Sequence, residues 1–165
     1  MGTSAFVSIG TAGSLQRDLN IGDLVLCEAA IRDEGVSHHY LPAAKLATAQ
    51  AGMTAALGAA LRQAGAPFRA GSSWTIDTPY RETVAEARRY QAEGVLCVEM
   101  EAAALFAVAE VRDLQVSAAF TISDSLADLV WNPQFHGAEV QAGLITLYGA
   151  AVSALQAASP YIGTS

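Results

Sequence analysis

Three short polar segments of the sequence each follow an apolar run and carry residue types that can hold a small ligand. The first spans residues 8–14, where Gly10 and Gly13 bracket Thr11 and Ala12. Glycines let backbone N–H groups approach an anion or a sugar closely, and the Thr11 hydroxyl adds a hydrogen-bond donor. The alternative for this segment is an ordinary turn at the end of a strand.

The second segment places two acids, Glu99 and Glu101, on either side of Met100, where an apolar strand-like run becomes an apolar helix-like run. A buried carboxylate is costly unless something donates hydrogen bonds to it. The vicinal hydroxyls of a sugar meet that need, because one carboxylate can accept two O–H donors while a methionine lies against the ring. The alternative is that both acids stand at a helix N-terminus, where the macrodipole favours negative charge.

The third segment is Ser123-Asp124-Ser125, directly after an apolar run. An aspartate between serines often caps a helix. A carboxyl group held in a low-dielectric site can instead act as a general acid. Such a group would protonate or hydrogen-bond N7 of a departing purine, and so would assist cleavage of an N-glycosidic bond.

These segments need a scaffold that brings strand ends together. Apolar runs predict strands over residues 5–9, 23–31, 68–76, 95–98 and 116–122, and helices are predicted over 43–63, 80–91, 100–111 and 134–157, with an irregular stretch at 123–133. Strands that alternate with helices indicate an α/β sheet covered on both faces, which binds ligands where its strands end. Only Met1-Gly2-Thr3-Ser4 precedes the first strand, so we expect an exposed sheet edge and a chain that is part of a larger α/β unit.

Composition narrows the class of protein. The 165 residues suit one domain, and a net charge of −7 argues against nucleic acid or an anionic membrane as the main partner. Cys27 and Cys97 lie in separate apolar runs, which favours buried, reduced thiols over a metal site or a disulfide. There is no signal-peptide pattern, and no apolar stretch reaches about 18 residues without a charge or a turn signal. We therefore expect a cytoplasmic protein with no membrane partner.

The order of these motifs resembles the purine nucleoside and uridine phosphorylase family. The resemblance covers about residues 6–157 and rests on Gly-Thr-Ala-Gly-Ser-Leu-Gln, Leu-x-Ile-Gly-Asp-Leu-Val-Leu, Val-Glu-Met-Glu-Ala-Ala and Ser-Asp. Residues 30–42 look like the uridine phosphorylase branch. The resemblance implies a three-layer α/β/α sandwich with a mixed central sheet, formed by a single domain over residues 1–165. It also implies that the chain matches the C-terminal two-thirds of the family, without the N-terminal phosphate loop.

The resemblance also implies roles for particular residues. Members of the family bind phosphate, ribose and base at motifs that match this sequence as follows: phosphate at Gly10 and Thr11, ribose at Glu99, Met100 and Glu101, and the base at Ala12, Gly13, Tyr80, Ser123 and Asp124, with Asp124 as the catalytic acid. No metal or organic cofactor is implied, and phosphate is the co-substrate. Relatives are homo-oligomers, so we expect the same here.

Some positions depart from the family pattern. Pro79 stands where the family has a base-stacking Phe, so Tyr80 or Trp74 is expected to take over the stacking. Ser8 stands where the phosphorylases carry an arginine, which removes a bidentate phosphate ligand.

Four further residues have weaker interpretations. His38 and His39 lie in a loop that approaches the active site in this family, but they are interpreted as surface or structural residues, and Arg32 as forming a structural ion pair or ordering that loop. Trp131 belongs either to an aromatic lid or to a packing anchor.

The leading hypothesis is therefore phosphorolysis of a nucleoside to free base and ribose 1-phosphate. A second possible reaction is hydrolysis of the same bond by water, because the related hydrolases also lack the arginine that Ser8 replaces. A catalytically inactive nucleoside-binding fragment is the alternative from another class. The base stays open, since Asp124 favours a purine while the His38-His39-Tyr40 loop favours a uridine phosphorylase-like scaffold.

Overall fold

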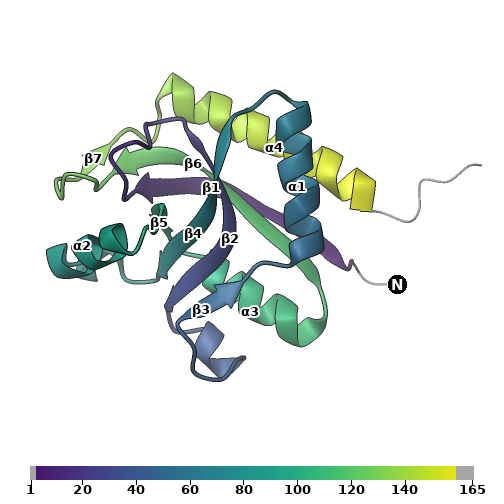
Figure 1. The fold of residues 1–165 in the computed structure, drawn as a ribbon, viewed down its shortest axis with the longest axis horizontal. Helices are drawn as coiled ribbons and strands as arrows, with labels where there is room; N and C mark the ends of the chain where they lie inside the picture. Colours follow the sequence, from purple (N-terminus) through teal and green to yellow (C-terminus); the bar gives the residue numbers. More distant parts are fainter. Residues whose placement is uncertain (1–2, 159–165) are drawn as a thin grey trace, which may run out of the picture.

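The computed structural model describes residues 3–158, and a mixed sheet of seven strands forms its centre (Figure 1). The strands lie in the order β3-β2-β4-β5-β1-β6-β7. Their bounds are β1 (Ala5–Ser14), β2 (Leu24–Asp33), β3 (Leu46–Thr48), β4 (Phe68–Ile76), β5 (Cys97–Glu99), β6 (Gln115–Ser125) and β7 (Asn132–Pro133). Strand β2 also pairs antiparallel with β6, so the sheet curves back on itself.

Helices flank this sheet on both sides. They are α1 (Ala51–Gln63), α2 (Val84–Ala92), α3 (Ala102–Arg112) and α4 (Ala138–Ala158), with short 3-10 turns η1 (Ser37–His39) and η2 (Pro79–Arg81). Helices α1 and α4 pack against each other beside the sheet, and α3 lies across it from them (Figure 1). The predicted α/β class with a mixed central sheet is confirmed.

Side chains of alternating direction divide the core into two layers. Leu24 and Leu26 of β2 pack in the cluster that contains Leu57 of α1, whereas Val25 and Cys27 pack in the cluster that contains Phe106 of α3. This is the period of two expected for a strand buried on both faces.

The two cysteines are buried, as predicted, and both are free thiols. Burial raises the pKa of the Cys27 thiol to about 12, and burial likewise raises the pKa of Cys97 well above its ordinary value. Both thiols are therefore protonated and unreactive at neutral pH.

Strand β1 is internal in the strand order, yet part of it has the exposed edge expected from the sequence. It pairs in parallel with β6 along its whole length and antiparallel with β5 at Gly13 and Ser14. In the described part of the chain, residues 5–12 of β1 have strand partners on β6 alone. One side of this segment is thus an open edge, although the strand itself is internal.

The predicted helices over 43–63 and 80–91 begin later than their patterns indicated. Residues 43–63 divide into β3, which pairs with β2 at Ala30 and its neighbours, and α1, which begins only after the extended Gln50. Strand pairing overrides the alanine-rich helical pattern there. Helix α2 begins at Val84 because Thr83 and Glu86 form a capping box.

Helix α4 is long and apolar enough to cross a membrane, contrary to the expectation from sequence. Its glycines, such as Gly143, are accommodated within one continuous helix. However, Val140, Gly143, Leu147 and Ala154 are buried on one face, which packs against α1 and the strands β1 and β6. This packing buries 33% of the apolar stretch of α4, while Ile145 and Tyr148 on the helix remain exposed.

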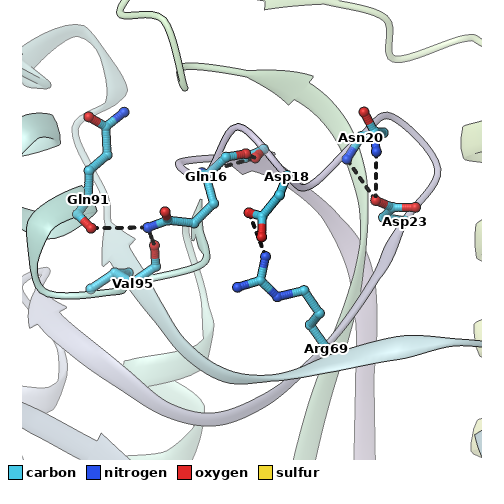
Figure 2. Close-up of polar contacts among 8 residues, drawn as sticks. Gln16, Asp18, Asn20, Asp23, Arg69, Gln91 and Val95 are labelled. Carbon is cyan, nitrogen blue, oxygen red and sulfur yellow. Dashed lines mark hydrogen bonds and ion pairs between the residues drawn. The ribbon is translucent and has the colours of Figure 1, made fainter.

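The loop after β1 is fixed by polar contacts to distant parts of the chain (Figure 2). The side-chain amide of Gln16 donates to the carbonyls of Gln91 (3.2 Å) and Val95 (2.7 Å), and Arg69 pairs with Asp18 at 2.7 Å. The bonds of Gln16 join the end of β1 to the end of α2 and to the residues before β5. They hold together the elements whose ends carry the polar segments.

Candidate active site

The three polar segments meet on neighbouring strands of the sheet. Gly13 of β1 lies opposite Val98 of β5 on one side and opposite Asp124 of β6 on the other. A register shift between Ala12 and Gly13 brings Asp124 level with Gly13. Because β1 and β6 are parallel, their carboxyl ends lie together, which is where α/β sheets place ligands.

A cavity of about 780 Å³ opens at these strand ends. All ten residues predicted for the site line it: Gly10, Thr11, Ala12, Gly13, Tyr80, Glu99, Met100, Glu101, Ser123 and Asp124. Its volume lies in the range of small-molecule sites, about 300–1,000 Å³. The sequence motifs therefore converge on one space large enough for a nucleoside.

Glu99 is buried, and its carboxylate is engaged by the protein itself. One oxygen accepts from the Ser73 (3.0 Å) and Thr75 hydroxyls, and the other accepts from the backbone N–H groups of Glu101 (2.8 Å) and Ala102 (2.7 Å). Burial raises the pKa of Glu99, and these hydrogen bonds oppose the rise. Glu99 thus satisfies the first N–H groups of α3, and its expected contact with ribose would have to displace one of these donors.

Glu101 is placed differently, although it is only two residues away. It precedes α3 as the N-cap residue, yet its side chain makes no capping hydrogen bond. Its side chain accepts one long bond, from the Met100 N–H at 3.3 Å, and both residues are exposed on the cavity wall. The carboxylate of Glu101 is therefore available to a ligand, as the ribose hypothesis requires.

Asp124 lies within β6 rather than at a helix N-terminus, so the capping interpretation is wrong. The next helix, α4, begins at Ala138. Only 8% of Asp124 is exposed. The Ser123 hydroxyl donates to Oδ1 at 2.8 Å, and the Trp131 indole Nε1–H donates to Oδ2 at 2.9 Å. A buried carboxylate with a fixed orientation at the wall of a cavity is suited to contact a ligand.

Gly13 leaves the space that Asp124 occupies. A Cβ atom at Gly13 would lie 2.9 Å from Asp124 Oδ2 and 3.1 Å from Val98 Cγ1. Gly13→Ala should therefore displace the carboxylate by some tenths of an ångström or more and lower kcat by about 10²-fold, while the fold survives. Steady-state kinetics and circular dichroism would check this. Gly149→Ala is the matched control because a Cβ there meets nothing within 4 Å; equal activity of both variants would contradict the prediction.

The two residues proposed to stack on the base, Trp74 and Tyr80, lie in different environments. Trp74 is fully buried, donates its indole N–H to Asp33 at 2.9 Å and packs on Tyr90, so it cannot stack on a base. Tyr80 is fully exposed at the cavity wall, together with Pro79. Of the two candidates, Tyr80 alone is in a position to contact a ligand.

The lining also includes residues that were not predicted for the site, among them Glu82, Leu129 and Phe135. Glu82 lies just before the capping box of α2, and that box is the local signal that places it in a loop. Leu129 and Phe135 have no comparable signal, because they reach the cavity only through the β6–β7 hairpin. Trp131, which the sequence assigned either to an aromatic lid or to a packing anchor, lines the cavity as well.

The negative charges around Glu82 make a prediction about pH. Burial raises the pKa of Glu82, and the charges of Asp124 and Glu86 raise it further. The folded state binds the proton of such a carboxyl group more tightly than the unfolded state does. The group therefore costs no stability below its unfolded-state pKa, and the free energy of unfolding decreases as the pH rises through the folded-state pKa. Glu82→Gln should therefore raise Tm at pH 7 but not at pH 4, as measured by thermal unfolding. Exposed Glu28→Gln is the control; a gain for Glu82→Gln that is equal at both pH values would contradict the prediction.

The cavity is strongly acidic. Four carboxylates line it, from Glu82, Glu99, Glu101 and Asp124, and no Lys, Arg or His does so among residues 3–158. Within the same described range, no three His, Cys, Asp or Glu side chains come together as metal ligands. The absence of a metal or an organic cofactor from the reaction stays a prediction.

The loop after β2 is held by its own polar contacts, away from the cavity lining. Arg32 donates to the Ser37 hydroxyl at 2.8 Å and to the Pro42 carbonyl at 2.7 Å, and His38 bonds the Arg32 carbonyl at 3.2 Å. These contacts agree with the structural interpretation of Arg32 and His38. Neither they nor His39 line the cavity.

A curved mixed sheet with a polar cavity at the carboxyl ends of its strands defines an α/β protein with a small-molecule site. The sequence profile of the Phosphorylase superfamily matches residues 1–152. This chain therefore belongs to the Phosphorylase superfamily.

Particular relatives agree with that assignment. A uridine phosphorylase of Salmonella typhimurium is 30% identical over 129 residues, which are 70% of this chain and 51% of that protein. A DeoD-type purine nucleoside phosphorylase of Alkaliphilus metalliredigens is 28% identical over 131 residues, covering 76% of this chain and 54% of that protein. The solved structure of the P knowlesi homolog of P falciparum PNP is similar with a TM-score of 0.78 and 26% identity, covering 94% of this chain and 64% of that one. The chain spans about half the length of these curated relatives.

Proposed function

We propose that the cavity binds a nucleoside and that the chain takes part in cleaving the bond between ribose and base. The observation that carries this proposal is the pairing of two different acids in one cavity. Glu101 is exposed and free to accept two ribose hydroxyls, whereas Asp124 is buried in the wall of a cavity that the apolar residues Leu126 and Phe135 also line. The hydroxyls of a sugar suit the exposed carboxylate of Glu101, and a base suits the more enclosed environment of Asp124.

The proposed reaction follows from this arrangement. The bond from C1′ to the base nitrogen breaks, its electrons leave with the base, and the ribose becomes oxocarbenium-like. Met100 and Glu101 orient the sugar, and Asp124 supplies or shares a proton at the departing base. Each Asp124 oxygen accepts one protein hydrogen bond and keeps a second lone pair for the base or for that proton.

Phosphate is the proposed acceptor, attacking C1′ from the side of Gly10 and Thr11 to give ribose 1-phosphate. The names of the relatives, uridine and purine nucleoside phosphorylase, support this choice. A second candidate is hydrolysis by water, which the cavity's charge favours. Four carboxylates and, within residues 3–158, no basic lining residue make a poor site for a phosphate dianion.

An assay of phosphate dependence tests both candidates. Inosine, adenosine and uridine would be incubated with the purified chain with and without phosphate, and base, ribose 1-phosphate and ribose would be separated by chromatography. Phosphorolysis requires ribose 1-phosphate that appears only with phosphate. Free ribose at equal rates in both conditions would establish hydrolysis, and nucleoside binding by calorimetry without any product would establish a non-catalytic binding site.

We also propose that the chain self-associates. Residues 5–12 of β1 present an open strand edge in the described range, and Phe6 on it is 42% exposed. Unpaired apolar edges favour association. Light scattering coupled to size-exclusion chromatography should therefore give a mass above 17.1 kDa, and calorimetry should find phosphate binding weak or absent. A monodisperse monomer that binds micromolar phosphate would contradict both expectations.

A further inference from the structure

The hairpin that follows β6 returns directly to Asp124. Strand β7 pairs antiparallel with β6, with Pro133 opposite Asp124 and Asn132 opposite Ser125, and the Gln134 N–H donates to the Ser123 carbonyl at 2.9 Å. Trp131 immediately precedes β7. Its position is thus tied, through adjacent backbone, to the strand that carries Asp124.

The tip of this hairpin is anchored on its other side as well. The Gln91 side chain of α2 donates to the carbonyls of Leu126 (3.4 Å) and Ala127 (3.1 Å). The Leu129 N–H donates to the Leu126 carbonyl at 2.8 Å and closes the turn. Leu129 has a φ of 60°, which leucine rarely adopts. These contacts tie the hairpin to α2 and to itself, and so constrain the placement of Trp131.

The contact with Trp131 engages one oxygen of the Asp124 carboxylate. Oδ2 receives the indole N–H at 2.9 Å, and it faces Gly13, where a Cβ would lie 2.9 Å away. Oδ1 receives the Ser123 hydroxyl at 2.8 Å. Hydrogen bonds of this length to both oxygens restrict the orientation of the Asp124 side chain.

Packing does not account for Trp131. The residue is 59% exposed, and the ring beside it, Phe135 at 6.1 Å, is itself largely exposed. Trp74, by comparison, is fully buried against Tyr90 and also donates its indole N–H to a carboxylate. Trp74 is a core residue, whereas the best-defined contact of Trp131 is the one to Asp124 at the cavity wall.

We propose that Trp131 is a positioning residue for Asp124. Its indole N–H holds Oδ2 so that the carboxylate keeps a single orientation toward the base, and its ring forms part of the cavity wall. This inference rests on the proposed function, because Asp124 needs a fixed orientation only if it meets a departing base. Trp131 acts through Asp124 and exchanges no proton with the substrate.

A double-mutant cycle tests this dependence. Trp131→Phe keeps an aromatic ring and removes the N–H, so kcat for a purine nucleoside should fall about 10- to 100-fold with little change in KM. In an Asp124→Ala background the same substitution should cost nothing, because there is no carboxylate left to position. Val130→Ala, at an exposed neighbour that does not line the cavity, should leave kcat unchanged. Independent, multiplicative losses from Trp131→Phe and Asp124→Ala would overturn the proposal.

Tryptophan fluorescence tests the contact without turnover. The chain has two tryptophans, and Trp74 is fully buried, so the emission lost in Trp131→Phe reports Trp131. Asp124→Ala should increase acrylamide quenching of that emission, whereas Asp128→Asn, which changes an exposed loop acid paired with Arg17, should not. Unchanged quenching in a folded Asp124→Ala variant would overturn the proposal. The expected quenching in a wild-type chain that cleaves no nucleoside would support the contact and overturn the proposed function.

Discussion

Asp124→Asn should slow cleavage of inosine or adenosine by about 10²- to 10⁴-fold, which is the usual contribution of a general acid. An amide of the same shape can receive the Trp131 N–H on its oxygen and donate its NH2 to the Ser123 hydroxyl, which can also accept, so the fold should persist. It cannot supply a carboxyl proton to the departing base. An activated nitrophenyl riboside needs no such help, because its leaving group departs as a stable anion.

The comparison of these two substrates is the measurement. The ratio of kcat/KM for the purine nucleoside to that for the nitrophenyl riboside should collapse in Asp124→Asn. Asp128→Asn is the matched control, since Asp128 is exposed and pairs with Arg17 at 2.8 Å. Equal losses on both substrates would show that Asp124 acts on the sugar or on the fold instead. The capping role that the sequence also allowed is already excluded, because Asp124 lies in β6.

Glu101→Gln should lower kcat/KM by roughly 10²-fold, because an amide accepts the two ribose hydroxyls less well than a carboxylate does. The loss should appear with every nucleoside, whatever its base, and with the nitrophenyl riboside too. Since Glu101 makes no capping bond in α3, the melting temperature should stay within a degree or two of the wild-type value.

Glu99→Gln provides the contrast, at a position two residues away. Its carboxylate accepts from four protein donors, so an amide nitrogen there would face a hydroxyl or backbone N–H it cannot accept from. Tm should fall by roughly 3–10 °C. Thermal unfolding and kinetics on both variants would separate the roles. A destabilised Glu101→Gln or a fully stable Glu99→Gln would show that the two acids have been assigned the wrong way round.

Much of the scaffold was predictable because its signals are local or periodic. Residues 116–122 are apolar except for Ser117 and Thr121, as expected of a strand covered on both faces, and β6 is buried from Val116 to Asp124. The family motifs predicted which residues share a site, and all of them line one cavity. Chain order and turn chemistry carry this information, since parallel strands end at the same edge of a sheet.

Other features depended on partners far along the chain. Residues 46–48 look helical but form β3, because β2 offers them a hydrogen-bonding edge. Glu99 and Glu101 look equivalent, yet only Glu99 meets Ser73 and Thr75 of β4. Local sequence preferences do not predict such long-range contacts, and these contacts decide the role of each acid.

The two tryptophans show the same division most clearly. By itself the sequence determined an α/β sheet, the strand ends that carry polar residues and the family to which they correspond. Only the tertiary structure decided that Trp74 is enclosed in the core while Trp131 reaches Asp124. The physical reason is that burial and hydrogen bonding depend on which surfaces come together in space. Here the pairing of β6 with β7 brings Trp131 to Asp124.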